Sequence, residues 1–488
     1  MKYKLMGLLG CLMMAAACLF TVLSEDPKEN RVHQHREAQE KTQIEARTAF
    51  GTHLPLVLID TAGQDVPGQP IWNDEGLHVG YKTAANGEKD ITAHIAIVDH
   101  EETYNYADDA PDMESLVKMH IRGHTSRSFD KPSYALTLID AAGENNPQPV
   151  MDMAAHHEWV LNGPFLDKTL FQNYMWYNIA GEIMDYAPNV RFCEVMLNGE
   201  YRGVYVMMER ITTGKHCRLP LTAVKKKSVF TGYLLRLDRG KKNPLKQVDS
   251  FTQYTRRADT ELDIQYPGAS KLTPELSQAI CRDFSKFEKA LYSFDYRDPK
   301  YGYRKQVGIF SFVDFFLLNE LTCNYDAGSL STYIYKGLDG RFRLCVWDFN
   351  SACDHYQHQS MVQPQRFEMQ NRLWFDMMMR DPYFTDLLIE EYQHLRKTFF
   401  SDEYLESYID EVVDYLGPAI ERNDAVWGYA YEQNLLMPEE RNPRSYEEAV
   451  EQVKTFLKER TDFMDAHIET LCEYSVPSAV KPYNAVTE

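Results

Sequence analysis

The sequence predicts an α+β protein with two lobes, a β-rich front lobe and a mainly helical back lobe. From about residue 54 to residue 237, short alternating or apolar runs are broken by Gly, Asn and Asp, which is typical of strands and turns. From residue 375 to residue 471, apolar residues recur instead at helical spacing. Because the two patterns meet around residues 240–275, we expect two packed lobes with a cleft between them.

The first residues predict export. Lys2 and Lys4 precede an uncharged run over residues 5–23, which would span about 28 Å as a helix, close to the hydrocarbon thickness of a bilayer. Residues 1–23 are therefore expected to be a signal sequence or membrane anchor, with a cleaved signal and a lipoprotein signal at Cys11 as alternatives. Residues 24–50 are highly charged and predict an exposed stalk. Because Lys2 and Lys4 should stay on the inner side of the membrane, the rest of the chain is expected outside it, either membrane-anchored at the cell surface or secreted.

The front lobe is expected over residues 51–250. Its clearest hairpin flanks Asn198-Gly199, a pair that suits the tight type I′ turn. Between the strands, residues 168–184 carry apolar side chains at helical spacing, so one helix is expected among the strands.

The back lobe is expected over residues 251–488 and begins its core with an apolar helix over residues 309–321. A hairpin should follow, with strands over residues 332–336 and 341–347 around a Gly-rich turn. Asp326 precedes the first strand and Asp348 follows the second. Because a hairpin returns its two outer ends to one place, the two carboxylates should be neighbours.

Two carboxylates about 5 Å apart repel by roughly 3 kcal/mol at an effective dielectric near 20, so something must offset the repulsion. A divalent cation, a shared proton or an arginine would do so. Phosphoryl transfer uses such a pair, because one carboxylate orients the attacking hydroxyl and another holds Mg²⁺ on the nucleotide. Asp326 is the expected catalytic residue and Asp348 the metal ligand, in the order that protein kinases use, with Asn350 adding an amide oxygen. The alternative is that these are ordinary turn and cap residues.

The front lobe should supply cations for the phosphates. The segment from Arg122 to Leu138 offers Arg122, Arg127 and Lys131 among glycine and small hydroxyl residues. Glu209, at the end of a later strand, is the expected partner of Lys131.

At these residues the chain resembles the CotH kinase family, which comprises secreted or spore-coat proteins with an atypical protein-kinase-like fold. The resemblance covers most of residues 54–470. It implies an ATP-dependent kinase that uses Mg²⁺ or Mn²⁺ and a protein substrate, with Asp326 catalytic, Asp348 on the metal and Lys131 on the nucleotide. This chain has Asn350 where the family more usually has a second aspartate, and Ser331 where asparagine is common. The motifs that carry the resemblance are IRGHTSRSFDKPSYAL, WVLNGPFLDKTLFQN, EVMLNGEYRGVYVMMER, NYDAGSLSTYIYK and VWDFN.

The net charge of the chain limits the classes of molecule that it is expected to bind. A formal net charge of −20 and the lack of a long basic stripe argue against a nucleic-acid partner. The main alternative to an enzyme is an inactive kinase-like scaffold or binding protein at the cell surface. A third hypothesis is another transfer from ATP, such as adenylylation. The acceptor and the oligomeric state cannot be read from the sequence.

Overall fold

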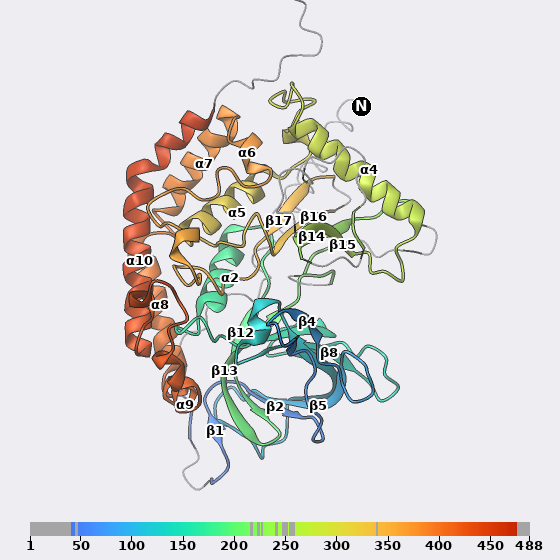
Figure 1. The fold of residues 1–488 in the computed structure, drawn as a ribbon, viewed down its shortest axis with the longest axis vertical. Helices are drawn as coiled ribbons and strands as arrows, with labels where there is room; N and C mark the ends of the chain where they lie inside the picture. The colour runs from blue at the N-terminus through green and yellow to red at the C-terminus, as the bar shows by residue number, and fades with distance from the viewer. Residues whose placement is uncertain are drawn as a thin grey trace, which may run out of the picture.

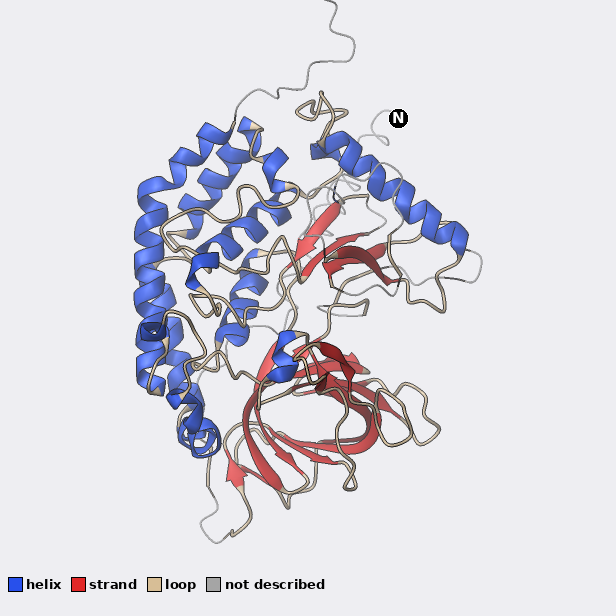
Figure 2. Cartoon of the chain, viewed as in Figure 1, coloured by secondary structure: helices blue, strands red, loops and turns tan. Residues whose placement is uncertain are grey.

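The computed structural model describes residues 41–43, 47–214, 218–221, 225, 228–239, 243–245, 252, 259–337 and 340–475. Its architecture is α+β, as predicted. A β-barrel forms one end of the molecule, helices line one side, and a small sheet lies between the helices and the barrel (Figures 1 and 2). The expected signal or anchor (residues 1–23) and most of the expected stalk (residues 24–50) lie outside the described residues.

The barrel closes through seven strands in the order β11-β13-β12-β2-β5-β7-β8. All neighbours are antiparallel except β2 and β12, which run parallel. The alternation in the sequence sets what faces inward: along β7, Val117 and Met119 are buried in the barrel core while Lys118 is exposed. The strands are β2 (Leu56–Asp60), β5 (Ile91–Val98), β7 (Met113–Arg122), β8 (Ser133–Ile139), β11 (Glu158–Asn162), β12 (Val190–Leu197) and β13 (Glu200–Glu209).

The predicted hairpin at Asn198-Gly199 is confirmed. Strands β12 and β13 pair on either side of it, and both turn residues have positive φ, 54° at Asn198 and 79° at Gly199. Positive φ at both central residues is what a type I′ turn requires. The predicted embedded helix is also present, as α2 (Gln172–Ile183).

The described residues also form three short two-stranded ribbons outside the barrel sheet. They pair β1 (Gly51–Thr52) with β6 (Asn105–Tyr106), β9 (Gln148–Val150) with β10 (Met153–His156), and β3 (Pro70–Trp72) with β4 (His78–Tyr81).

A separate four-stranded antiparallel sheet has the order β15-β14-β16-β17. The predicted hairpin is confirmed as β16 (Thr332–Lys336) and β17 (Phe342–Cys345), although the second strand is shorter than expected. Its neighbours are β14 (Tyr233–Asp238) and β15 (Glu261–Tyr266). The sheet therefore combines strands from both sides of the division that the sequence suggests at residue 250.

The helices pack around this sheet and share one core with it. The apolar helix expected over residues 309–321 is confirmed as α5 (Ile309–Leu321), which is buried along nearly its whole length. Side-chain caps at Thr273, Asp381, Ser401 and Ser445 fix where four helices begin. The other helices are α4 (Pro274–Leu291), α6 (Phe375–Met378), α7 (Pro382–Leu395), α8 (Asp402–Leu416), α9 (Pro418–Trp427) and α10 (Tyr446–His467).

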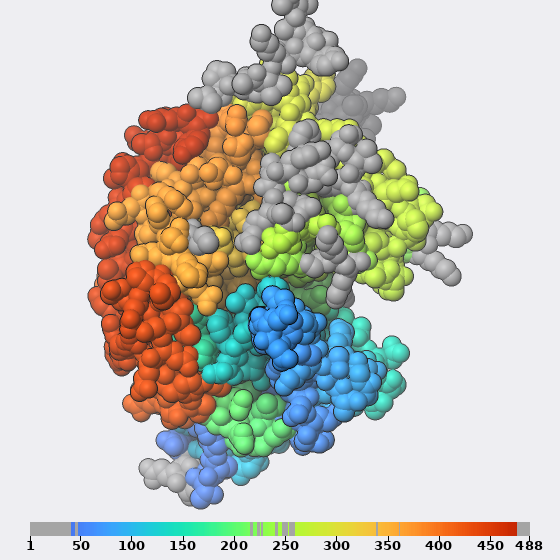
Figure 3. Space-filling view, in the orientation of Figure 1, coloured from blue at the N-terminus to red at the C-terminus, as the bar shows by residue number. Residues whose placement is uncertain are grey.

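Helix α9 ties the helical part to the barrel by packing on β13. At the contact, a Cβ on Gly203 would lie 2.6 Å from Asn423 Oδ1, so only glycine allows this approach. The indole of Trp427 donates to the carbonyl of Arg202 at 2.8 Å. In the space-filling view the orange and red C-terminal helices run along one side of the molecule and reach the green barrel strands (Figure 3).

Across the described residues, every helix is too short or too polar to traverse a lipid bilayer. The apolar run over residues 5–23 lies outside the described residues.

Candidate active site

A cavity of about 1060 Å³ lies between the barrel and the four-stranded sheet. One wall is the outer face of β7, β8 and β11, and the other is formed by the loops at one end of the sheet. Five of the seven predicted site residues line this cavity. They are Arg122, Arg127, Asp326, Asp348 and Asn350.

The strand register explains why acidic residues gather at this end of the sheet. Leu237 near the end of β14 is opposite Thr332 at the start of β16, and Tyr333 is opposite Cys345 at the end of β17. The end of β14, the end of β17 and the start of β16 therefore lie at the same end of the sheet, and so do the residues next to them. This brings Asp238 into the cavity beside Asp348.

The backbone of Asp348 is held in an uncommon conformation. Its φ is 63°, in the left-handed region that a non-glycine residue enters only at a cost. Its N–H donates to the hydroxyl of Tyr177 at 2.8 Å, and its carbonyl accepts from Asn324 Nδ2 at 3.2 Å. These bonds connect α2 and the loop preceding Asp326 to the segment that carries Asp348.

Desolvation raises the pKa of Asp348, and the charge of Arg122 opposes that rise. Asp238 adds to the rise because it carries the same charge. A desolvated carboxyl group with a second acid nearby suits a divalent cation, which would stabilise the ionised form. Asp348 therefore fits the metal that the sequence predicts.

Asn350 is oriented by a relay of amides. The N–H of Phe349 donates to Asn173 Oδ1 at 2.9 Å, so the Asn173 nitrogen faces away from it and donates to Asn350 Oδ1 at 2.7 Å. The Asn350 nitrogen then donates to Asp348 Oδ1 at 2.5 Å. Because a backbone N–H fixes the start of the relay, Asn350 presents a donor, and not its oxygen, to the Asp348 carboxylate. In this arrangement Asn350 positions Asp348. For the side-chain oxygen of Asn350 to bind a metal, the side-chain amides of Asn173 and Asn350 would have to rotate.

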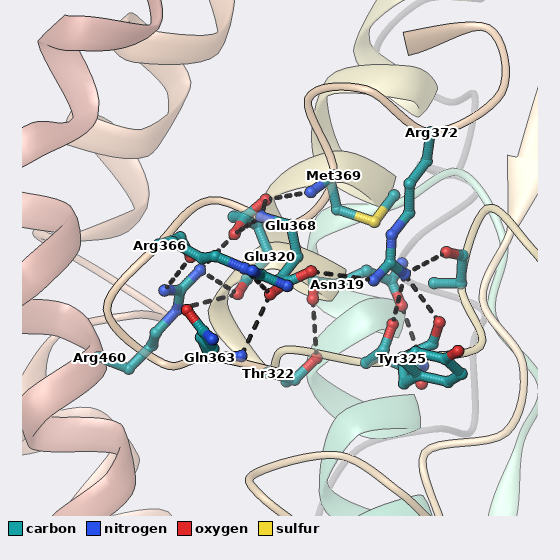
Figure 4. Close-up of polar contacts among 12 residues, drawn as sticks. Asn319, Glu320, Thr322, Tyr325, Gln363, Arg366, Glu368, Met369, Arg372 and Arg460 are labelled. Atoms are coloured by element: carbon teal, nitrogen blue, oxygen red, sulfur yellow. Dashed lines mark hydrogen bonds and ion pairs between the residues drawn. The ribbon is translucent and has the colours of Figure 1, made fainter. Parts of the chain in front are cut away.

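The loop that carries Asp326 is braced from the helical side by Arg372 (Figure 4). The Nη1 atom of Arg372 lies 3.1 Å from the carbonyl oxygen of Asn324, 2.8 Å from that of Tyr325 and 2.7 Å from that of Ala327. The loop also closes on itself, because the N–H of Leu330 donates to the Asp326 carbonyl at 2.7 Å. One guanidinium thus fixes the chain on both sides of Asp326.

A buried charge network supports this brace (Figure 4). Arg372 pairs with Glu368 at 3.5 Å, and the N–H groups of Glu368 and Met369 donate to the carboxylate of Glu320 at the end of α5. Arg460 of α10 completes the network by pairing with Glu320, and both side chains are fully buried. Burial raises the pKa of Glu320 and Arg460 opposes that rise.

The facing wall of the cavity carries the basic residues Lys118 and Arg122 together with the acids Asp90 and Glu158. Lys118, His120 and Arg122 alternate with buried residues along β7 and so share its outer face. The Arg122 guanidinium lies 5.6 Å from the ring centroid of Trp347, next to Asp348. Arg122 is therefore the predicted basic residue that the structure brings to the acidic wall.

Lys131 does not line this cavity. Its side chain is only 1% exposed, and its Nζ donates to Asn423 Oδ1 of α9 at 2.8 Å, near the rings of Tyr205 and Trp427. Desolvation lowers the pKa of Lys131 to about 7, and the nearby charge of Lys168 adds to the decrease.

The predicted pairing of Lys131 with Glu209 is wrong, because Glu209 has other partners. It lies 3.4 Å from Arg218 Nε and accepts a bond from the N–H of Asn189. Burial raises the pKa of Glu209, while Arg218 lowers it.

Sequence reasoning missed several residues that shape the site. Asp238 ends a strand that runs into the same end of the sheet as Asp348, but only the pairing of β14 with β16 reveals this. The side-chain amides of Asn173 and Asn324 form hydrogen bonds with the 348–350 segment. Arg372 holds the Asp326 loop through hydrogen bonds to backbone carbonyls. None of these three roles has a motif that a single sequence displays.

The structure thus defines an α+β protein in which two acid-bearing loops and a barrel wall that carries Arg122 line one cavity. In a comparison with known families, the sequence profile described as CotH kinase protein matches residues 119–464. The chain belongs to the CotH kinase family, as the motifs predict. A comparison with curated proteins found no significant match.

Proposed function

We propose that this protein is a metal-dependent kinase that transfers the γ-phosphate of ATP to a hydroxyl group of a protein. The observation that carries the proposal is the cavity itself, which Asp326, Asp348 and Arg122 all line. Phosphoryl transfer requires an acid for the acceptor, an acid for the metal and a cation for the phosphates, and one cavity provides all three.

In the proposed reaction, Asp326 accepts the proton of the acceptor hydroxyl as its oxygen bonds to the γ-phosphorus. The bond between the γ-phosphorus and the bridging oxygen breaks, and ADP leaves with that electron pair. Arg122 stabilises negative charge on the phosphates. A Mg²⁺ or Mn²⁺ ion held by Asp348, with Asp238 near, would neutralise charge on the nucleotide.

A matched set of variants of the full-length protein tests this proposal. ATP with Mg²⁺ should raise the melting temperature of the parent protein, and Asp348→Ala should abolish that shift. Asp326→Ala should keep the shift and lose the transfer of labelled phosphate. Asp386→Ala, at an exposed position on α7, should change neither. A shift that Asp348→Ala leaves intact, or one seen equally in EDTA, contradicts the proposal.

The second candidate is an inactive kinase-like scaffold. The orientation of Asn350 favours this candidate. Its side-chain nitrogen faces Asp348, so its oxygen is not placed beside Asp348 to bind a metal. A protein that shows no shift with ATP and any divalent cation supports this candidate. A third product, a transferred adenylyl group, would be recognised by the mass it adds to the acceptor.

We further propose that the protein is exported and held at the cell surface by residues 5–23. The support is the sequence alone, with two lysines before an apolar run. Protease added to intact cells should digest the chain after residue 23, and protection of the whole chain contradicts the proposal.

A further inference from the structure

The β3–β4 ribbon exposes five large apolar side chains along its two strands and the turn between them. It pairs with no other strand among the described residues, and two-stranded ribbons of this size are weak structures in water. Contiguous exposed apolar patches of this kind mark interaction sites. The exposed fractions are 41% for Ile71, 54% for Trp72, 58% for Leu77, 60% for Val79 and 36% for Tyr81.

The ribbon is continuous with the cavity that holds Asp326. Gly68 and Tyr81 at its base line the cavity. Arg127 fastens this base, because it donates to the carbonyl of Gly68 at 2.9 Å and lies 4.1 Å from the centroid of the Tyr81 ring. Figure 1 places β4 at the end of the barrel that faces the four-stranded sheet.

Lysines adjoin the ribbon along the same cavity. Lys82 follows β4 directly, and Lys118 projects from β7. Among the described residues, neither ammonium group has a hydrogen-bond or ion-pair partner. Lys118 and Arg122 are four residues apart on one strand, so their positions differ by about 13 Å. Lys118 therefore lies at a distance from the phosphate-binding end that an extended peptide of a few residues would span.

We propose that the β3–β4 ribbon, together with Lys82 and Lys118, is the docking surface for an extended acceptor polypeptide that carries apolar and acidic residues. The apolar residues of the acceptor would pack on the ribbon while its acidic residues pair with the lysines, which places its hydroxyl near Asp326. The inference rests on the proposed kinase function, because it assigns the acceptor to the same cavity. At about 1060 Å³, the cavity exceeds the size usual for one small ligand, so a nucleotide leaves room for acceptor side chains.

The charge of the ribbon favours a polypeptide over a lipid surface. Its turn carries Asp74 and Glu75, both exposed at the tip between the apolar residues. Insertion of this tip into an anionic bilayer would bring these carboxylates against like charge and out of water. An acidic polypeptide can instead lie along the ribbon with the tip in solvent.

The test measures binding of full-length protein without nucleotide to two disordered probes, dephosphorylated casein (acidic) and myelin basic protein (basic). Trp72→Ser with Val79→Ser should weaken casein binding at least tenfold, and Lys82→Glu with Lys118→Glu should do the same. The control is Phe294→Ser with Tyr301→Ser, at similarly exposed positions after α4 (48% and 63%), and should change binding less than twofold. Melting temperatures equal to that of the parent show that each variant is folded.

Four outcomes overturn the inference. It fails if casein does not bind, if the ribbon variant binds casein like the parent, or if myelin basic protein binds more tightly than casein. It also fails if the ribbon variant loses binding to vesicles of phosphatidylglycerol and phosphatidylcholine while casein binding is unchanged. Ribbon-dependent casein binding with no phosphate transfer to casein or any other protein would instead contradict the kinase proposal and leave the docking surface standing.

Discussion

Arg372 holds the backbone on both sides of Asp326. Its guanidinium donates to the carbonyls of Tyr325 and Ala327, the residues that flank the proposed catalytic aspartate, and its charge is balanced by Glu368. The Asp326 loop contributes mainly backbone groups to this contact, so its shape depends on a side chain far along the chain. Misplacement of a reacting group by about 1 Å can reduce catalysis by about a hundredfold.

Arg372→Ala should therefore slow phosphate transfer by about tenfold to a hundredfold while binding of ATP with Mg²⁺ at Asp348 is little changed. Hydrogen exchange of residues 322–330 should speed up, because the carbonyls lose their donor and the loop opens more often. Arg372→Lys should recover only part of the effect, since an ammonium cannot reproduce the guanidinium geometry.

Arg366→Ala is the matched control. Arg366 pairs with the same Glu368 but is about half exposed, and its side chain has no hydrogen bond or ion pair to the described Asp326 loop. If Arg366→Ala and Arg372→Ala alter hydrogen exchange of the loop equally, the brace is a general stability effect and Arg372 does not position Asp326.

Local patterns predicted several elements of the fold. The hairpin β16–β17, the Asn198-Gly199 turn and helix α5 depend on neighbouring residues, so their period and turn chemistry were enough to find them. The resemblance to the CotH kinase family rests in part on the segments of these two hairpins, and the family match confirms it.

Contacts between distant segments could not be predicted in this way. Lys131 was expected at the nucleotide because the resemblance to the CotH kinase family implies that contact, with an ordinary exposed lysine as the alternative. The burial of Lys131 depends on Asn423, which lies 292 residues further along the chain. The closure of the barrel similarly needs β2 to pair in parallel with β12, and no local signal specifies that pairing.

Asn350→Asp should make the protein depend on a divalent cation for stability. The substitution replaces the amide donor to Asp348 with a second carboxylate, so repulsion of roughly 1–3 kcal/mol should lower the melting temperature by a few degrees in EDTA. Mg²⁺ should restore the loss, giving a larger metal-induced shift than in the parent. Equal melting temperatures in EDTA would show that the amide relay does not hold Asp348, and Asn350→Ser controls for the loss of the donor alone.

Lys131→Met should flatten the dependence of stability on pH in the alkaline range. The folded protein holds the pKa of Lys131 at about 7, below its ordinary value of 10.5, so the unfolded chain binds more protons between these limits. Stability from this group is thus fully present above about pH 10.5 and is lost as pH falls toward 7. Urea unfolding should show the parent gaining up to about 3 kcal/mol relative to Lys131→Met from pH 7 to 9.5. A difference that stays constant with pH would mean that Lys131 remains charged in the folded state.

Arg460→Met should destabilise the protein by about 3–5 kcal/mol, because it leaves Glu320 buried without its cation. The double variant Glu320→Gln with Arg460→Met should recover part of that loss, since the neutral amide keeps an acceptor for the N–H groups of Glu368 and Met369. Without Arg460 the pKa of Glu320 should rise further above its ordinary value, so the deficit of the single variant should shrink as pH falls from 8 to 5 and the carboxyl group takes up a proton. Urea unfolding at both pH values measures these differences. A double variant less stable than the single one at pH 8 would show that Glu320 contributes through its hydrogen bonds alone, and that its charge does not require Arg460.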